Sequence, residues 1–128
     1  MKAGMYGEAD LQSILEAASG DGVAQSFHLA STIHDKQSFS DAIRSVVPLN
    51  PPIPNGPANW DALADSLFDG MLSVRGPVIL RWPNHELMAA SAPNDYAVAI
   101  EIFQVLIREL ASETTTVGRP TKLFVVLE

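Results

Sequence analysis

Two short and mostly apolar segments constrain the fold of this chain more than any other feature. One covers residues 76–82 and is bounded by Pro77 and Pro83, and the other covers residues 121–127. A run of this length without polar alternation is typical of a strand buried on both faces of a sheet. Helical periodicity fills the chain between them, so we expect parallel strands joined by right-handed helical crossovers.

Helical segments are predicted on both sides of the first apolar run. Asn59 is placed to cap a helix that ends at Gly70 or shortly after, and Asn94-Asp95 opens a long helix that ends near Leu110. The segment Ser38–Asp41 resembles a capping box that opens an earlier helix. The apolar stripes of the Asn59 helix and of the long helix are, respectively, Trp60, Leu63, Ala64, Leu67, Phe68 and Met71, and Ala97, Ile100, Phe103, Leu106, Ile107 and Leu110.

The remaining segments complete an α/β pattern. Residues 25–31 are predicted to form a first strand, the five prolines within residues 48–57 indicate a loop, and residues 84–90 form a brief helical piece. The expected fold class is therefore α/β, with a three-stranded parallel sheet packed by helices over residues 25–128. Residues 1–24 are interpreted as an N-terminal extension that carries a short helix ended by Gly20-Asp21-Gly22.

Charge and composition exclude several classes of function. The chain has 15 Asp and Glu against 8 Lys and Arg, which gives a formal charge of -7 and disfavours direct binding of nucleic acid. It contains no cysteine, no apolar run long enough to cross a membrane and no signal-peptide pattern at its start. We therefore expect a cytoplasmic protein without membrane partners.

Catalytic and cofactor motifs are also missing from the sequence. His28, His34 and His85 are scattered without the spacing of metal ligands, and no nucleophile elbow, phosphate-binding loop or dinucleotide fingerprint is present. The sequence predicts neither an enzyme nor a metal site, a cofactor or a small-molecule substrate.

Three carboxylates recur every fourth residue on the Asn59 helix, at Asp61, Asp65 and Asp69. This spacing places them in one stripe beside the apolar face. They could be solvated surface, with Asp61 favouring the helix N-terminus. Alternatively, they could accept charge-assisted hydrogen bonds from Arg, Lys or protonated His of a basic partner, with Asp69 the weakest candidate.

The segment Asn59-Trp-Asp-Ala-Leu-Ala-Asp-Ser-Leu67 resembles the second-helix motif of the barstar family. Residues 77–82 are similar to the central strand of that family, and residues 122–128 to its last strand. The resemblance implies a small inhibitor that plugs the active site of a secreted ribonuclease with the helix and the loop before it.

The resemblance also implies a set of partner-binding residues: Asp61 and Asp65 as acidic contacts, the capping Asn59, Gly56 of the preceding loop, Ala64, and Glu109 (or Arg108, one residue away) on the last helix. The chain departs from the family pattern where Ala64 replaces an interfacial Trp, and where the proline-rich loop replaces a tyrosine pair. The leading hypothesis is an immunity protein against a basic ribonuclease toxin. The alternative is a binder of another basic protein on the same fold.

Overall fold

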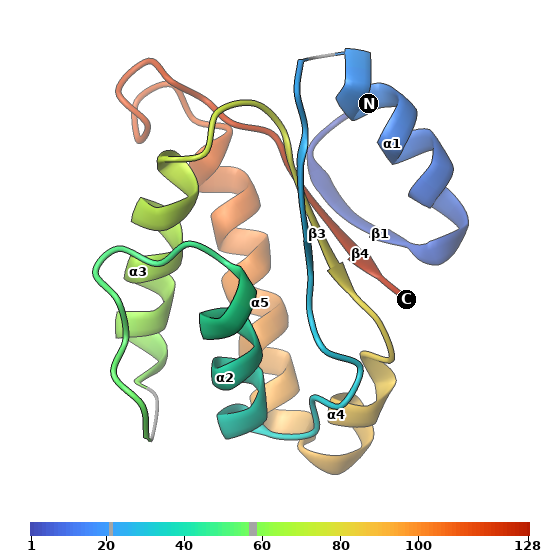
Figure 1. Cartoon of the computed structure of the whole chain (residues 1–128), viewed down its shortest axis with the longest axis vertical. Coiled ribbons are helices and arrows are strands. Elements are labelled where there is room, and N and C mark those ends of the chain that lie inside the picture. Colours follow the sequence, from blue (N-terminus) through green and yellow to red (C-terminus); the bar gives the residue numbers. More distant parts are fainter. Residues whose placement is uncertain (21, 57–58) are drawn as a thin grey trace.

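Four short strands lie side by side in one parallel sheet, in the order β1-β4-β3-β2. The strands are β1 (Gly4–Gly7), β2 (Gln25–His28), β3 (Val78–Trp82) and β4 (Leu123–Leu127). This arrangement comes from a computed structural model of the chain, which describes residues 1–20, 22–56 and 59–128 (Figure 1). The two apolar runs form the central pair of strands, as their composition predicts.

The prediction of three strands is wrong, because the sheet has a fourth strand from the N-terminal segment. Strand β1 pairs with β4 from Gly4 opposite Phe124 to Gly7 opposite Leu127. The sequence GMYG offers neither an apolar run nor a clear alternation, so it gives no strand signal of its own. Its pairing depends on the free edge of β4, which supplies hydrogen-bond partners that only the folded chain provides.

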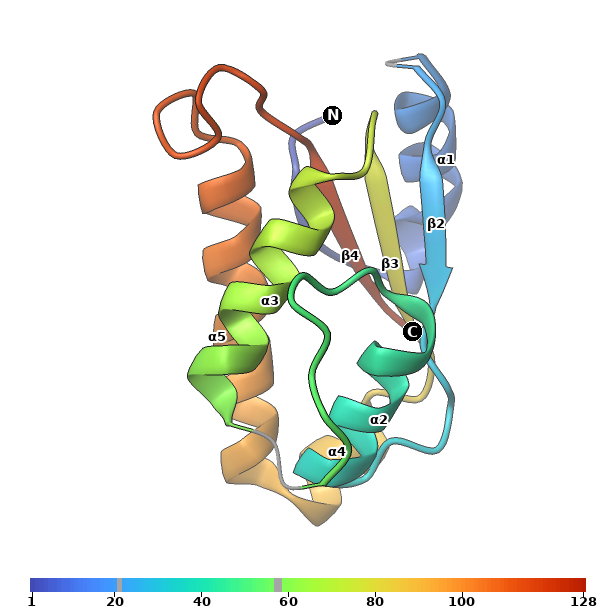
Figure 2. The same ribbon diagram turned by 60° about the vertical axis from the view of Figure 1, so that its left-hand side comes forward.

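Helices cover both faces of the sheet (Figures 1 and 2). Helix α1 (Leu11–Gly20), preceded by a 3-10 turn at Glu8–Asp10, lies on one face. Helices α2 (Lys36–Val46), α3 (Trp60–Leu72) and α5 (Pro93–Leu110) lie on the other, and α4 (Glu86–Ser91) follows the end of β3. Helices α3 and α5 run side by side in the same direction, because each precedes a parallel strand.

The core has two parts that the sheet separates. The larger part fills the space between the sheet and helices α2, α3 and α5, around the fully buried Phe39, Trp82 and Phe103. The smaller part lies under α1 and consists of five buried residues: Ile14, Ala18, Ile79, Phe124 and Val126. The N-terminal segment therefore supplies both an edge strand and the cover of one sheet face.

Two helix starts differ from the sequence prediction. The capping box of α2 is formed by Asp35 and Ser38, whose backbone N–H donates to Asp35 Oδ1 at 2.8 Å. It begins earlier than expected because Asp35 already offers a carboxylate three residues before Ser38. Helix α5 begins at Pro93 rather than at Asn94-Asp95, and proline suits that first position because it has no N–H to leave unpaired.

The loop between α2 and α3 is irregular from Pro48 to Gly56, as the prolines predict, while its last predicted residue, Pro57, lies outside the described residues. Leu49 and Ile53 anchor the loop by packing against the larger core.

Asp21, in the predicted stop after α1, is also outside the described residues. Within the described chain, no helix is sufficiently long and apolar to span a bilayer.

Candidate acidic groove for a basic partner

Helix α3 presents its aspartates on a rigid, capped scaffold. The side-chain Oδ1 of Asn59 accepts hydrogen bonds from the backbone N–H groups of Asp61 at 2.9 Å and Ala62 at 3.2 Å. The predicted cap is thus confirmed, and it satisfies N–H groups that the first helical turn leaves without partners. Asp61, Asp65 and Asp69 are all exposed. The spacing of four residues sets them in one row along the helix.

This row borders a groove of about 650 Å³ between α3 and α5. Its lining contains five carboxylates, those of Asp61, Asp65, Asp69, Glu101 and Glu109. None of the five forms an ion pair with another described residue, and no described Lys or Arg lines the groove. The groove is therefore a concentration of uncompensated negative charge, which attracts a cationic surface.

The structure brings together four of the predicted partner-binding residues. Asp61, Ala64 and Asp65 enter the groove from α3, and Glu109 enters it from α5. Asn59 and Gly56 are not among the lining residues. Asn59 acts as the helix cap, and Gly56 lies in the loop with a φ of 114°, a conformation that favours glycine.

Glu109 and Arg108, the two alternatives on α5, line different hollows of the surface. Glu109 lines the groove, whereas Arg108 lines a separate hollow together with Met1, Lys2 and Lys122. Neighbouring residues on a helix point about 100° apart, so only one of the two can face α3. Of the two, Glu109 is therefore the one that shares a groove with the aspartate row.

Residues 24–127 match the family model described as "Barstar (barnase inhibitor)". The chain belongs to the barstar family. No match was found among curated proteins or among solved structures. The family is one of inhibitors rather than enzymes, which agrees with the prediction that this chain is not an enzyme. The barstar match runs from just before β2 to the end of β4, and it leaves β1 and α1 outside.

Sequence reasoning missed part of the groove. Glu101 supplies a carboxylate from α5, eight residues before Glu109, and Val105 lies halfway between them on the same helical face. That spacing is a signal that the sequence does contain. What it could not show is that this face of α5 lies next to the aspartate row of α3, because the pairing of the two helices depends on the order of the strands.

The two tryptophans occupy different positions. Trp82 is completely buried and contacts Phe39, with ring centroids 5.3 Å apart, as expected for a core residue. Trp60 is half-buried, lines the groove and has the Lys36 Nζ 5.2 Å from its ring centroid. Trp60 therefore contacts both the larger core and the end of the groove where α3 begins.

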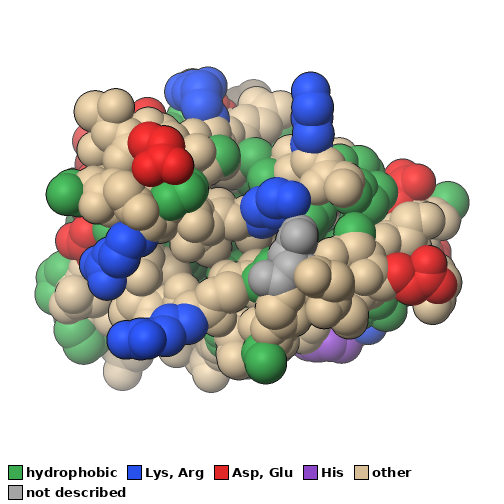
Figure 3. Space-filling view, turned by 90° about the horizontal axis from the view of Figure 1, so that it is seen from above, with side chains coloured by type: hydrophobic (Ala, Val, Ile, Leu, Met, Phe, Trp, Pro, Cys, Tyr) green, Lys and Arg blue, Asp and Glu red, His purple; other side chains and the backbone are tan. Residues whose placement is uncertain are grey.

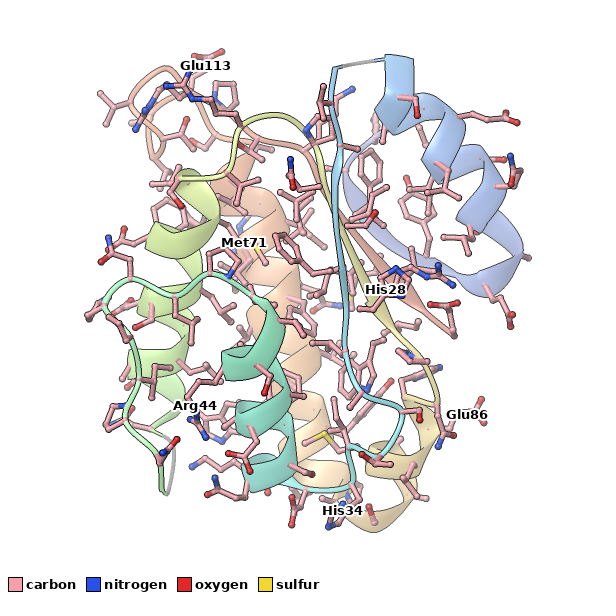
Figure 4. The ribbon with its side chains drawn as sticks, in the orientation of Figure 1. His28, His34, Arg44, Met71, Glu86 and Glu113 are labelled. Atoms are coloured by element: carbon pink, nitrogen blue, oxygen red, sulfur yellow. The ribbon has the colours of Figure 1, made fainter. Side chains whose placement is uncertain are left out.

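The histidines form no common site. Figure 4 shows His28 beside the sheet near the middle of the molecule and His34 at its lower end. The ring of His85 lies elsewhere, with Nδ1 2.7 Å from the hydroxyl of Tyr96. Over residues 1–20, 22–56 and 59–128, no group of three His, Asp or Glu side chains is arranged to hold a metal ion.

Several Lys and Arg side chains gather on the end of the molecule that Figure 3 shows from above. This is the end where β3 and β4 begin (Figure 1). Five of the eight Lys and Arg residues line hollows there: Lys2, Arg75, Arg108, Arg119 and Lys122. Asp69 lines both the acidic groove and a hollow that contains Arg75 and Arg119. The acidic groove thus ends at a cationic boundary.

Proposed function

We propose that this protein is an immunity protein that inhibits a small, basic, secreted ribonuclease by covering its active site with the acidic groove between α3 and α5. The proposal rests on five carboxylates around one groove, none of which forms an ion pair within the described part of the chain. The chain that carries them belongs to a family of barnase inhibitors. A producing cell would need such an inhibitor in its cytoplasm, where its own RNA is exposed.

Ribonuclease chemistry explains why carboxylates suit this task. An active site that holds phosphates gathers Arg, Lys and protonated His in a cleft. Carboxylates held on a capped helix accept charge-assisted hydrogen bonds from those groups and thereby occupy the place of the phosphates. Asp65 lies in the middle of the row, so it is the contact that a bound partner would desolvate most completely, and desolvated anchors carry more binding energy than rim charges.

Repulsion between the aspartates, which lowers the stability of the unbound protein, also supports a binding role. Like charges four residues apart on a helix destabilise it by roughly 0.2–0.5 kcal/mol per pair. The row on α3 contains two such pairs, Asp61 with Asp65 and Asp65 with Asp69, and no ion pair among the described residues offsets them. Asp61 gains from its place at the helix N-terminus, but Asp65 and Asp69 have no such compensation. Their repulsion is explained if the compensation comes from a partner.

The test is inhibition of barnase and of other small basic microbial ribonucleases by the purified protein and its Asp65→Ala variant. Glu16→Ala is the matched control, because Glu16 is an exposed carboxylate on α1, across the sheet from the groove. We expect inhibition at near-stoichiometric amounts by the wild type and the control, and a loss of at least about tenfold for Asp65→Ala, which corresponds to about 1.4 kcal/mol.

Salt dependence adds a second readout. Association between a basic enzyme and this groove should slow markedly between about 50 mM and 500 mM salt, because the charges that steer encounter become screened. If Asp65→Ala inhibits as well as the wild type, the site assignment is wrong. If no ribonuclease is inhibited, the ribonuclease proposal fails.

A second candidate function keeps the groove and changes the target to a basic protein that is not a nuclease. Ala64 favours this candidate, because it leaves a hollow in the groove where the family pattern has a large aromatic residue. A toxin captured by the wild type but not by Asp65→Ala, and without ribonuclease activity, would establish it.

A further inference from the structure

The acidic groove has an apolar floor, which its charge alone does not require. The uncharged residues that line it are mostly hydrophobic: Trp60, Ala64, Phe68, Val98, Ile102, Val105 and Leu106. Val105 is 36% exposed, and Ala64, Phe68 and Val98 are half-buried. A partner that offered only cations would leave this floor in contact with water or with an unmatched polar surface.

The dimensions of the floor are those of a short helix. Along α3 the lining residues extend from position 60 to 69, and along α5 from position 98 to 109. At 1.5 Å per residue these segments are roughly 14 and 17 Å long, which is about three helical turns. Because the two helices run side by side in the same direction, the trough between them is continuous along this length (Figure 2).

Charge lies on both sides of the floor. Asp61, Asp65 and Asp69 border it on α3, while Glu101 and Glu109 border it on α5. A matching surface has an apolar stripe with cations on both sides of it. This is the pattern of an amphipathic helix whose hydrophobic residues recur every three or four positions and whose flanking positions are Lys or Arg.

We propose that the groove binds a cationic amphipathic helix of the partner protein, with an apolar side chain of that helix seated over Ala64. The inference rests on the proposed function for its choice of site, and it specifies the structural element that the partner inserts. A helix fits better than an extended strand because its backbone N–H and C=O groups are bonded within it. The backbones of α3 and α5 are likewise internally bonded, so a strand on the floor would find no partners for its own.

The first experiment uses a defined probe. A fluorescent peptide of about 14 residues, with Leu at helical a and d positions and Lys beside them, is titrated with the wild-type protein at about 50 mM salt. A control peptide has the same composition in an order that no longer separates Leu from Lys. We expect the amphipathic peptide to bind at least about tenfold more tightly. Equal binding of both peptides would show attraction by charge alone and would overturn the proposal, as would no binding.

Variants of the floor provide the second comparison. Ala64→Trp fills the hollow, and the matched control Ala62→Trp adds the same side chain at an exposed position of α3 that does not line the groove. We expect Ala64→Trp to weaken binding of the amphipathic peptide at least about tenfold and Ala62→Trp to leave it unchanged. Val105→Ser removes apolar floor without adding bulk, so it weakens binding even if Ala64→Trp disturbs folding. Unchanged binding by both floor variants would contradict the inference.

The same variants separate this inference from the proposed function. If the wild type and Ala64→Trp inhibit a ribonuclease equally well, the inhibitor function stands and the docking of a helix is wrong. If no ribonuclease is inhibited but the amphipathic peptide binds in an Ala64-dependent manner, the groove inference stands and the ribonuclease target is wrong.

Discussion

Gly70 of α3 lies so close to the carbonyl of Pro48 that an added Cβ would be 1.9 Å from that oxygen. The contact brings the start of the proline-rich loop against the last turns of α3, near Asp69 and the end of the groove that lies toward the C-terminus of this helix. The backbone N–H of Asn50 also donates to the Ser66 carbonyl at 3.1 Å. The loop and the helix are therefore held together by backbone contacts.

Gly70→Ala should lower the free energy of unfolding by roughly 1–3 kcal/mol, because either the loop or the helix must move to admit the methyl group. The control is Gly20→Ala at the end of α1, where nothing lies within 4 Å of the added Cβ. There, the better helix propensity of alanine should leave stability unchanged or slightly higher. Urea unfolding of both variants measures the difference, and equal stabilities would contradict the close approach.

Asp69→Asn should stabilise the free protein by roughly 0.3–1 kcal/mol. Asp69 is in the last turns of α3, where the helix dipole disfavours an anion, and it repels Asp65 four residues earlier. The same substitution should weaken binding of a basic partner, so stability and affinity change in opposite directions. Thermal unfolding and a binding titration of one variant check both parts, and a destabilised Asp69→Asn would mean that this carboxylate has a favourable partner in the free protein.

Ile14→Ala should lower the free energy of unfolding by about 2–5 kcal/mol, the usual cost of such a cavity in a core. Ile14 is a fully buried residue of α1 and packs with Ile79, Phe124 and Val126 of the sheet. A loss well below this range would mean that α1 contributes little to the stability of the fold and that residues 1–24 are only an extension of the domain at residues 25–128. Inhibition by the variant that remains folded should be normal, because α1 and the groove lie on opposite faces.

Glu128→Gln should make the protein less stable at pH 7 by about 1 kcal/mol, since its partly exposed ion pair with Arg81 is lost. Arg81 donates to Glu128 from Nε at 2.9 Å and from a terminal nitrogen at 2.6 Å. These hydrogen bonds lower the pKa of Glu128 below its usual 4.5.

The sign of the pH dependence follows from that lowered pKa. The stabilisation from Glu128 is complete above pH 4.5 and is lost as the pH falls through the pKa of the folded protein. Urea unfolding at several pH values should therefore show the wild type and Glu128→Gln converging in acid. The double variant with Arg81→Gln should be more stable than the sum of the single changes predicts, because each single change already removes the ion pair. Strict additivity would show that the two residues do not interact.

Local sequence pattern determined the central strands, the capped helix α3 and its row of aspartates. The apolar runs had to be buried, and Asn59 could satisfy the N–H groups of Asp61 and Ala62 through contacts only two and three residues away. The barstar motif was also readable at this level, because it consists of neighbouring residues in one helix.

Tertiary structure decided the features that depend on residues far apart in the sequence. Strand β1 forms because the edge of β4 is free to pair with Gly4–Gly7. The sequence of these four residues has no pattern that would predict a strand. The groove exists because parallel strand pairing places α5 beside α3, so that Glu101 and Glu109 face the aspartates across an apolar floor. Backbone pairing and helix packing are relations between segments, and a periodicity within one segment does not specify its neighbour.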